Sequence, residues 1–201
     1  NLTPAGGDIT VTGSTNYEVS TDNTNFASSK TVAYTGGALG ATPIYIRLKA
    51  GLSSGTYNSE TVANSGGGAT AQNVTCSGTV SAAPTPTITI SETTLAFGEE
   101  CTGIISAEQS YAVSGSYLTN DITITPPTGY EISTGTGASF SATNPITLTR
   151  SGGTVGVTDI FVRFTPGAVQ AYNGSISNVS SGATTKNVTL SGNGVNLAPS
   201  V

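Results

Sequence analysis

The stretch Ile160-Phe161-Val162-Arg163-Phe164 decides the fold, because its core-facing apolar side chains recur with a two-residue period. The same pattern occurs 116 residues earlier as Ile44-Tyr45-Ile46-Arg47-Leu48. Alternate side chains of an extended strand point to opposite faces, so this period is typical of a half-buried β-strand. Its recurrence indicates that two similar domains each contain this strand.

The repeat extends over most of the chain. The further matches are Tyr17-Glu18-Val19-Ser20 with Tyr130-Glu131-Ile132-Ser133, Gly36-Gly37 with Gly152-Gly153, Tyr57-Asn58 with Tyr172-Asn173, and Asn73-Val74-Thr75 with Asn187-Val188-Thr189. Their offsets lie between 113 and 116 residues, so only short loop changes separate the copies. A period of this length corresponds to one whole small domain per repeat.

The composition favours strands over helices. Thr, Ser, Val and Ile are abundant, whereas the chain has no Met, Trp or His. Turn residues such as Pro126-Pro127-Thr128-Gly129 separate the alternating stretches, and no window of ten residues has helical periodicity. Short strands at intervals of roughly 8–12 residues predict an all-β fold of tandem immunoglobulin-like β-sandwich domains.

The repeat also predicts the domain boundaries. We assign repeat 1 to residues 1–80, a linker to 81–86, repeat 2 to 87–194, and the start of a further linker to 195–201. The first linker contains Pro84 and Pro86, and this composition is typical of a semi-rigid spacer that holds neighbouring domains apart.

Repeat 1 lacks its first strands. Leu2 corresponds to Leu118, yet the 31 residues Thr87–Tyr117 that precede Leu118 have no counterpart. They contain three strand-like stretches, Thr87–Ile90, Leu95–Phe97 and Ser110–Val113. One interpretation is that the natural polypeptide extends beyond both ends of this sequence. The alternative is that a neighbouring chain supplies the strands by strand addition.

The composition argues against several classes of function. The net charge is −5, only 8% of residues are charged, and Lys and Arg do not cluster, which argues against nucleic acid as a partner. No apolar run approaches the ~20 residues that cross a bilayer. Without His, the hydroxyl groups lack the commonest general base, and no Lys lies in a catalytic motif, so we predict that the chain is not an enzyme.

Metal sites are also poorly supported, and we predict no cofactor. Zinc is disfavoured by the absence of His and by two widely separated Cys. Glu99-Glu100, with Glu92 nearby, is interpreted as a solvated edge beside a turn. Calcium between domains is the alternative for these carboxylates.

Two charged pairs occupy equivalent positions in the copies, namely Glu18 with Arg47 and Glu131 with Arg163. All four side chains lie at outward positions of their strands. If the two strands of each copy are neighbours, each pair forms a structural cross-strand ion pair. A ligand-binding Arg is the alternative.

The two cysteines, Cys76 and Cys101, are candidates for a disulfide or for buried thiols, and the repeat argues against their pairing with each other. Cys76 aligns with the inward position Leu190, so its partner could lie in the absent start of repeat 1. Cys101 is then expected to face Leu190 in repeat 2. The alternative is two unpaired buried thiols.

Several motifs of repeat 2 carry a resemblance to a known family. They are Phe97-Gly98, Cys101, Ser110–Gly115, Leu118, Asp121–Ser133, Leu148–Val155, Val162–Pro166 and Asn187–Gly192. Together they resemble the tandem Ig-like repeats of large secreted and surface proteins of Bacteroidota, especially Flavobacteria. The resemblance covers repeat 2 and the latter two thirds of repeat 1.

The resemblance implies export by the type IX secretion system and a location at the cell surface or in the medium. It implies no catalytic residues. Such repeats occur in giant adhesins, including those of gliding motility, and as spacers beside enzyme domains.

We therefore expect a stalk or filament segment of a surface adhesin, whose partners are neighbouring repeats of the same long chain. The alternatives are a module that binds surface glycans or proteins, and a spacer in a secreted multidomain enzyme. The aromatic candidates for binding are Tyr57, Tyr172, Tyr117 and Phe140. Because Tyr57 and Tyr172 recur beside turn residues, a structural corner is the first interpretation for them.

Overall fold

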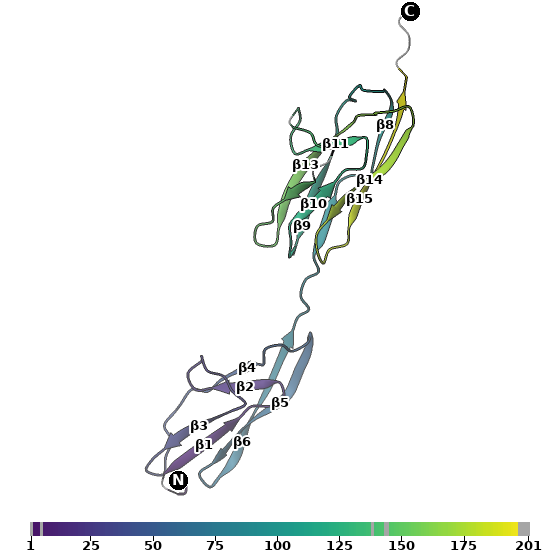
Figure 1. Ribbon diagram of the computed structural model, residues 1–201. Coiled ribbons are helices and arrows are strands. Elements are labelled where there is room, and N and C mark those ends of the chain that lie inside the picture. The colour runs from purple at the N-terminus through teal and green to yellow at the C-terminus, as the bar shows by residue number, and fades with distance from the viewer. Residues whose placement is uncertain (1, 5, 138, 143–144, 197–201) are drawn as a thin grey trace, which may run out of the picture. The chain divides into compact units, whose positions relative to one another are not determined.

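The computed structural model describes residues 2–4, 6–137, 139–142 and 145–196 (Figure 1). These residues contain fifteen β-strands and no helix, so the predicted all-β class is confirmed. The chain forms two compact units, unit 1 (Asn1–Ala83) and unit 2 (Pro84–Val201).

Unit 2 is a sandwich of two sheets. Its strands are β7 (Thr87–Ile90), β8 (Thr94–Cys101), β9 (Gln109–Ser116), β10 (Ile122–Thr125), β11 (Tyr130–Ser133), β12 (Ile146–Leu148), β13 (Val155–Phe164), β14 (Ala171–Val179) and β15 (Lys186–Val195). A five-stranded sheet has the order β12-β10-β14-β15-β8, and a four-stranded sheet has the order β11-β13-β9-β7. The predicted immunoglobulin-like sandwich is confirmed.

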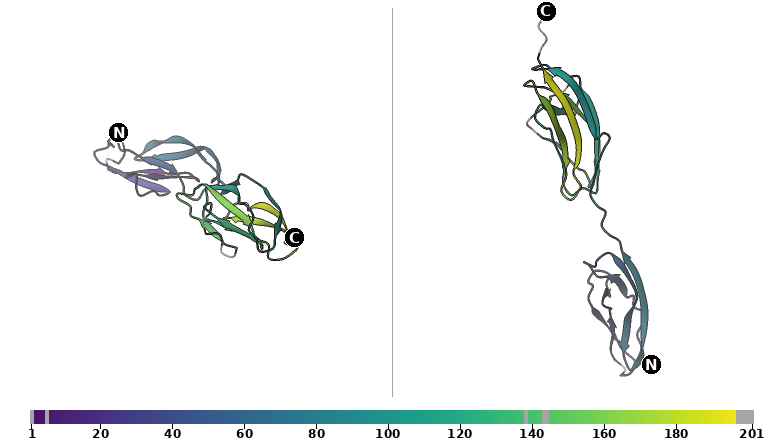
Figure 2. Two further views of the ribbon diagram at one scale, coloured as in Figure 1. Left: turned by 90° about the horizontal axis from the view of Figure 1, so that it is seen from above. Right: turned by 90° about the vertical axis from the view of Figure 1, so that its right-hand side faces the viewer.

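The first strand of unit 2 is divided between the sheets. β7 pairs antiparallel with β9, the chain then crosses over, and β8 pairs parallel with β15. In this parallel register Thr94 lies opposite Thr189 and Cys101 opposite Val195. Because β15 is the last strand and runs in the same direction as β8, the chain enters unit 2 at one end and leaves at the other (Figures 1 and 2).

The core of unit 2 receives side chains from all nine strands. Its aromatic part is a cluster in which the rings of Tyr130 and Phe164 stack at 5.0 Å and Tyr172 meets Phe164 edge-on at 5.3 Å. Phe97 lies against the same rings. Each fully buried aliphatic side chain stabilises the fold by about 1.5–3 kcal/mol, so this core is the main source of stability.

Unit 1 contains β1 (Gly7–Thr12), β2 (Tyr17–Ser20), β3 (Ser29–Tyr34), β4 (Tyr45–Leu48), β5 (Gly55–Gly66) and β6 (Ala69–Val80). Its sheet orders are β3-β1-β5-β6 and β2-β4. These orders match β12-β10-β14-β15 and β11-β13 of unit 2. Among the described residues of unit 1, nothing corresponds to β7, β8 or β9.

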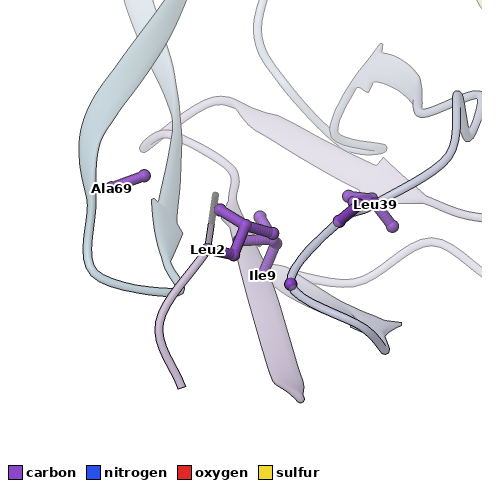
Figure 3. Close-up of a pocket in the computed structure, with 6 residues that line it drawn as sticks. Leu2, Ile9, Leu39 and Ala69 are labelled. Atoms are coloured by element: carbon purple, nitrogen blue, oxygen red, sulfur yellow. The ribbon is translucent and has the colours of Figure 1, made fainter. Parts of the chain in front are cut away.

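The core of unit 1 is correspondingly small. Val11, Tyr17, Val19 and Val62 are buried, and other apolar side chains are only partly covered. A hollow of about 520 Å³ opens beside this core, lined by Leu2, Ile9, Gly37, Ala38, Leu39 and Ala69 (Figure 3).

The strands end close to the predicted domain boundaries. β6 ends at Val80 and β7 begins at Thr87, so residues 81–86 lie between strands. The predicted segment 195–201 begins within β15, because Val195 pairs with Cys101 at the end of β8. Its last part, residues 197–201, lies outside the described residues.

Candidate functional site

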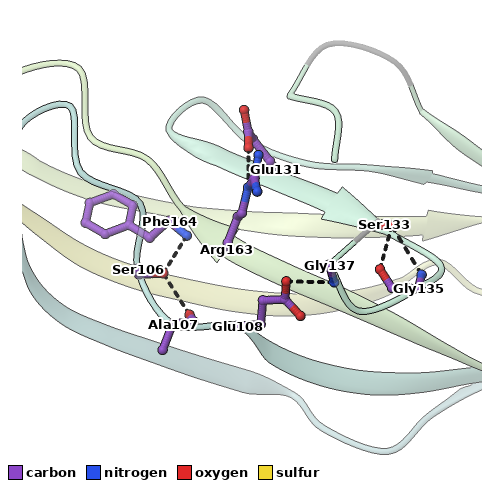
Figure 4. A network of polar contacts seen from close by, with 9 residues as sticks. All are labelled: Ser106, Ala107, Glu108, Glu131, Ser133, Gly135, Gly137, Arg163 and Phe164. Atoms are coloured by element: carbon purple, nitrogen blue, oxygen red, sulfur yellow. Dashed lines mark hydrogen bonds and ion pairs between the residues drawn. The ribbon is translucent and has the colours of Figure 1, made fainter. Parts of the chain in front are cut away.

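In each of the two charged pairs that recur in the sequence, the glutamate and the arginine lie directly opposite each other on neighbouring strands. In unit 1, Arg47 Nε is 2.7 Å from Glu18 Oε1, between β4 and β2. In unit 2, Arg163 Nε is 2.5 Å from Glu131 Oε2, between β13 and β11 (Figure 4). The Arg163 side chain is 25% exposed and that of Arg47 is 54% exposed, so the pair of unit 2 is the better shielded from water.

An aromatic ring completes each pair. Arg47 Cζ lies 3.8 Å from the ring centroid of Phe26, and Arg163 Cζ lies 4.2 Å from that of Phe140. A cation over an aromatic face is attracted by the ring quadrupole. The guanidinium is therefore held by both a carboxylate and a ring, and this arrangement favours a structural role over ligand binding.

These aromatic partners of the two arginines were not predicted from the strand pattern. Phe140 was a candidate for binding surface glycans or proteins, but Arg163 lies over its ring. Phe26 and Phe140 each precede a residue that bridges to the strand of the glutamate, namely Ala27 to Val19 and Ser141 to Ile132. Their recurrence at an offset of 114 residues was the signal that could have identified them.

A second polar network adjoins the ion pair of unit 2 (Figure 4). The carboxylate of Glu108 accepts hydrogen bonds from Thr136 Oγ1 at 2.6 Å and from the Gly137 N–H at 3.0 Å. These two bonds, in that order, and then the charge of Arg163 lower the pKa of Glu108. The network fastens the start of β9 to the loop after β11.

The recurring tyrosines hold loops in place. Tyr57 Oη donates to the Ser53 carbonyl at 2.7 Å, and Tyr172 Oη accepts from the N–H groups of Gly167 and Ala168 at 3.0 and 2.9 Å. These contacts support the structural-corner interpretation.

The backbone carbonyls of Tyr57 and Tyr172 each accept a hydrogen bond from the hydroxyl of another tyrosine. That of Tyr57 accepts from the hydroxyl of Tyr17, and that of Tyr172 accepts from the hydroxyl of Tyr130. The remaining aromatic candidate, Tyr117, is 61% exposed in the loop after β9.

Both cysteines are free and half-buried. Burial, and secondarily the charge of Glu60, raises the pKa of the Cys76 thiol. The prediction that Cys101 faces Leu190 is wrong, because β8 and β15 align Leu190 with Leu95 and Cys101 with Val195. The parallel direction of β8 and the register shift after Ser191 place Cys101 at the far end of the ladder.

The carboxylates considered for calcium lie near the same edge strand. Glu99 and Glu100 pair with Asn193 and Gly194 on β15, and Glu92 lies in the crossover between β7 and β8. In the part of the chain that the structure describes, no three His, Cys, Asp or Glu side chains form a group suited to a metal ion. Nor do the described residues include a helix long and apolar enough to cross a membrane.

Comparison with known proteins gives a distant likeness only. No family model matches the sequence, and no curated protein matches it. The chain is similar to ASH/PapD-like domain 7 of human CEP192, with 13% identity, coverage of 59% of this chain and 92% of that one, and a TM-score of 0.35. It is also similar to the CupB6 tip adhesin from Pseudomonas aeruginosa, with 12% identity, coverage of 94% and 80%, and a TM-score of 0.39. At these values neither likeness carries an argument about function.

Proposed function

We propose that this chain is a non-catalytic, load-bearing segment of a cell-surface adhesin, built from Ig-like units and exported by a type IX secretion system. Gliding motility is the setting that the sequence resemblance suggests. The observation that supports a load-bearing role most directly is the parallel pairing of β8 with β15 in unit 2.

This pairing determines how tension acts on unit 2. The chain enters through β7 and β8 and leaves after β15, so a pull on the two ends loads β7 against β9 and draws the parallel strands β8 and β15 past each other. All ladder hydrogen bonds between them are then loaded together. A ladder pulled from one end instead loses its bonds one after another, which requires less force.

Side-chain packing supports the same ladder. Leu95 and Leu190 lie opposite each other and are both buried in the core. Just after the end of β8 at Cys101, the Thr102 N–H donates to the Val195 carbonyl at 2.9 Å and extends the contact with β15. Sliding of β8 along β15 would break these contacts together with the ladder.

The polar side chains that recur in the units are engaged in structural contacts. The glutamates and arginines pair across strands, and the corner tyrosines hold loops. A segment with this arrangement suits a stalk between other parts of a surface protein.

Single-molecule force spectroscopy tests the load-bearing role. The full chain with Cys76→Ser is stretched either by its two termini or between the thiol of Cys101 and the C-terminus. The first geometry shears β8 from β15, and the second unzips them from the end where both strands finish. We expect a several-fold higher rupture force for unit 2 in shear, with a length gain of about 35 nm for the roughly 100 residues released.

Equal rupture forces in the two geometries would contradict the proposal. The surface location is tested separately with an antibody against residues Thr87–Gly194. We expect labelling of intact cells by a protein of several hundred kilodaltons, whereas a small soluble protein in the medium would rule out the adhesin assignment.

A further inference from the structure

We propose that the open side of unit 1 is a strand-acceptor site, and that its occupant is a polypeptide segment with the pattern of Thr87–Tyr117 that joins the chain at Leu2. This inference concerns unit 1 alone and does not depend on the mechanical role of unit 2.

The topology of the two units locates the site. In unit 2, β15 pairs with β8 and β13 pairs with β9. The equivalent strands of unit 1, β6 and β4, have these sides unpaired within the described residues. Unpaired strand edges present backbone N–H and C=O groups in the geometry that an added strand uses.

The side chains of β6 are patterned for a covered face. Val74 lies opposite the buried Val62, as Val188 lies opposite Ile176 in unit 2. Yet Val74 is 47% exposed, whereas Val188 is fully buried. Cys76, which aligns with the fully buried Leu190, is only partly buried. Inward apolar side chains left in water indicate that a further layer belongs on this side.

The hollow of unit 1 lies at the position that β9 occupies in unit 2. Leu2, Ile9 and Leu39 line it (Figure 3), and their equivalents are Leu118, Ile122 and Val155. Those three are 3%, 0% and 4% exposed, whereas Leu39 is 38% exposed.

Gly115 of β9 forms the cover over this part of unit 2. A Cβ atom at Gly115 would lie 2.5 Å from Leu118 Cδ1 and 3.1 Å from Ile122 Cδ1. The occupant of the hollow therefore needs a glycine, or a similarly close approach of the backbone, at that position.

A polar group on β5 specifies the occupant further. Asn64 Nδ2 donates to the Gln72 carbonyl, as Asn178 Nδ2 donates to the Lys186 carbonyl. In unit 2, Asn178 Oδ1 also accepts from Tyr111 of β9 at 3.0 Å. A strand bound beside β4 would bring the corresponding tyrosine to Asn64, so the site favours a donor with tyrosine at this position.

One backbone hydrogen bond indicates where the occupant would be connected to unit 1. The Leu2 N–H donates to the Gly37 carbonyl at 2.8 Å, and the Leu118 N–H donates to the Gly153 carbonyl at the same distance. Leu118 follows β9 after a single residue, Tyr117. A segment whose last residue takes the position before Leu2, as Tyr117 precedes Leu118, is therefore positioned to lie along β4 as β9 lies along β13.

Alkylation of Cys76 provides a direct measurement. In the full chain with Cys101→Ser, the reaction rate of Cys76 with a maleimide is measured alone and with a synthetic peptide of Thr87–Tyr117 that carries the same Cys101→Ser substitution, so that Cys76 is the only thiol. The same chain with the Cys101→Ser form of Thr87–Tyr117 fused to Leu2 in place of Asn1 provides a covalent form. We expect at least a tenfold slower reaction in the fusion, and saturable protection by the free peptide.

Matched variants test the assigned contacts. In the acceptor, Val74→Asp should abolish protection, whereas Thr75→Asp, on the opposite face of β6, should not. In the donor, Tyr111→Phe should weaken protection several-fold, and a scrambled peptide should give none.

The proposal is overturned if the fused segment leaves Cys76 as reactive as before, whatever the free peptide does. It is also overturned if Val74→Asp has no effect, or if the scrambled peptide protects equally. Self-association of the unmodified chain that protects Cys76, detected by analytical ultracentrifugation, would identify a second copy as the occupant and would equally overturn it.

Discussion

The hydroxyl of Tyr111 donates a hydrogen bond to Asn178 Oδ1, 3.0 Å away, and links the two sheets of unit 2 through the core. Both side chains are buried, and Asn178 Nδ2 donates to the Lys186 carbonyl at 3.0 Å. The pair is a satisfied polar contact in otherwise apolar surroundings, and such contacts are sensitive to the loss of one partner.

Tyr111→Phe should therefore destabilise unit 2. The substitution leaves Asn178 Oδ1 buried without its donor, which costs about 1–3 kcal/mol. Urea denaturation measures the change. The matched control is Tyr117→Phe, because Tyr117 is 61% exposed, and we expect a change within about 0.5 kcal/mol there. Equal effects of the two substitutions would contradict the assigned role of the bond.

Aspartate at equivalent valines should affect the units very differently. Val188→Asp places a carboxylate in the core of unit 2 and should lower its stability by more than about 3 kcal/mol. Val74→Asp introduces the charge at a solvent-exposed position, so we expect a change within about 0.5 kcal/mol. Calorimetry of the full chain separates the two transitions. A large loss in unit 1 would show that Val74 is already covered.

The ion pairs should contribute unequally. A double-mutant cycle with Arg163→Gln and Glu131→Gln should give a coupling energy of about 0.5–1 kcal/mol. The cycle for Arg47 and Glu18 should give less, because Arg47 is the more exposed side chain. Added salt should reduce both values.

Phe140→Leu should lower the coupling in unit 2, because Arg163 then loses its aromatic partner. Unchanged coupling in this variant would show that the ring contributes nothing to the pair.

Alkaline pH should destabilise unit 2. Burial raises the pKa of Tyr130 from 10.0 to about 12, and burial also raises the pKa of Tyr111. Since the folded state favours the protonated hydroxyl, this stabilisation is complete below pH 10 and declines as the pH rises towards about 12. The denaturation midpoint measured across this window should fall. Tyr130→Phe should flatten the decline, and an unchanged slope in that variant would assign the effect to other groups.

The positions of the strands and the cross-strand pairing of the charged residues could be predicted from the sequence, for a physical reason. Two-residue alternation locates a strand, and antiparallel pairing of neighbouring strands places Glu131 opposite Arg163. The repeat served as an internal comparison, because each feature was seen in two copies. The alignment of Leu2 with Leu118 also predicted that the described residues of unit 1 would contain no counterparts to β7, β8 and β9.

Other contacts could not be derived from the alternation of side chains. Phe140 reaches Arg163 from a loop, and alternation says nothing about loop residues. Cys101 was misplaced because its position depends on the crossover from one sheet to the other and on a register shift in the parallel ladder. Neither feature has a periodic signature in the sequence.

The pairing of β8 with β15 has a further consequence for the order in which unit 2 can be completed. Leu95 and Leu190 are neighbours in the sheet but lie 95 residues apart in the chain. Contacts of such long sequence separation form slowly, because a large loop must close before they are gained. During synthesis, β8 emerges among the first strands and can acquire its partner only when the last strand has been made. Until then the five-stranded sheet lacks β15, and β8 has no partner in it.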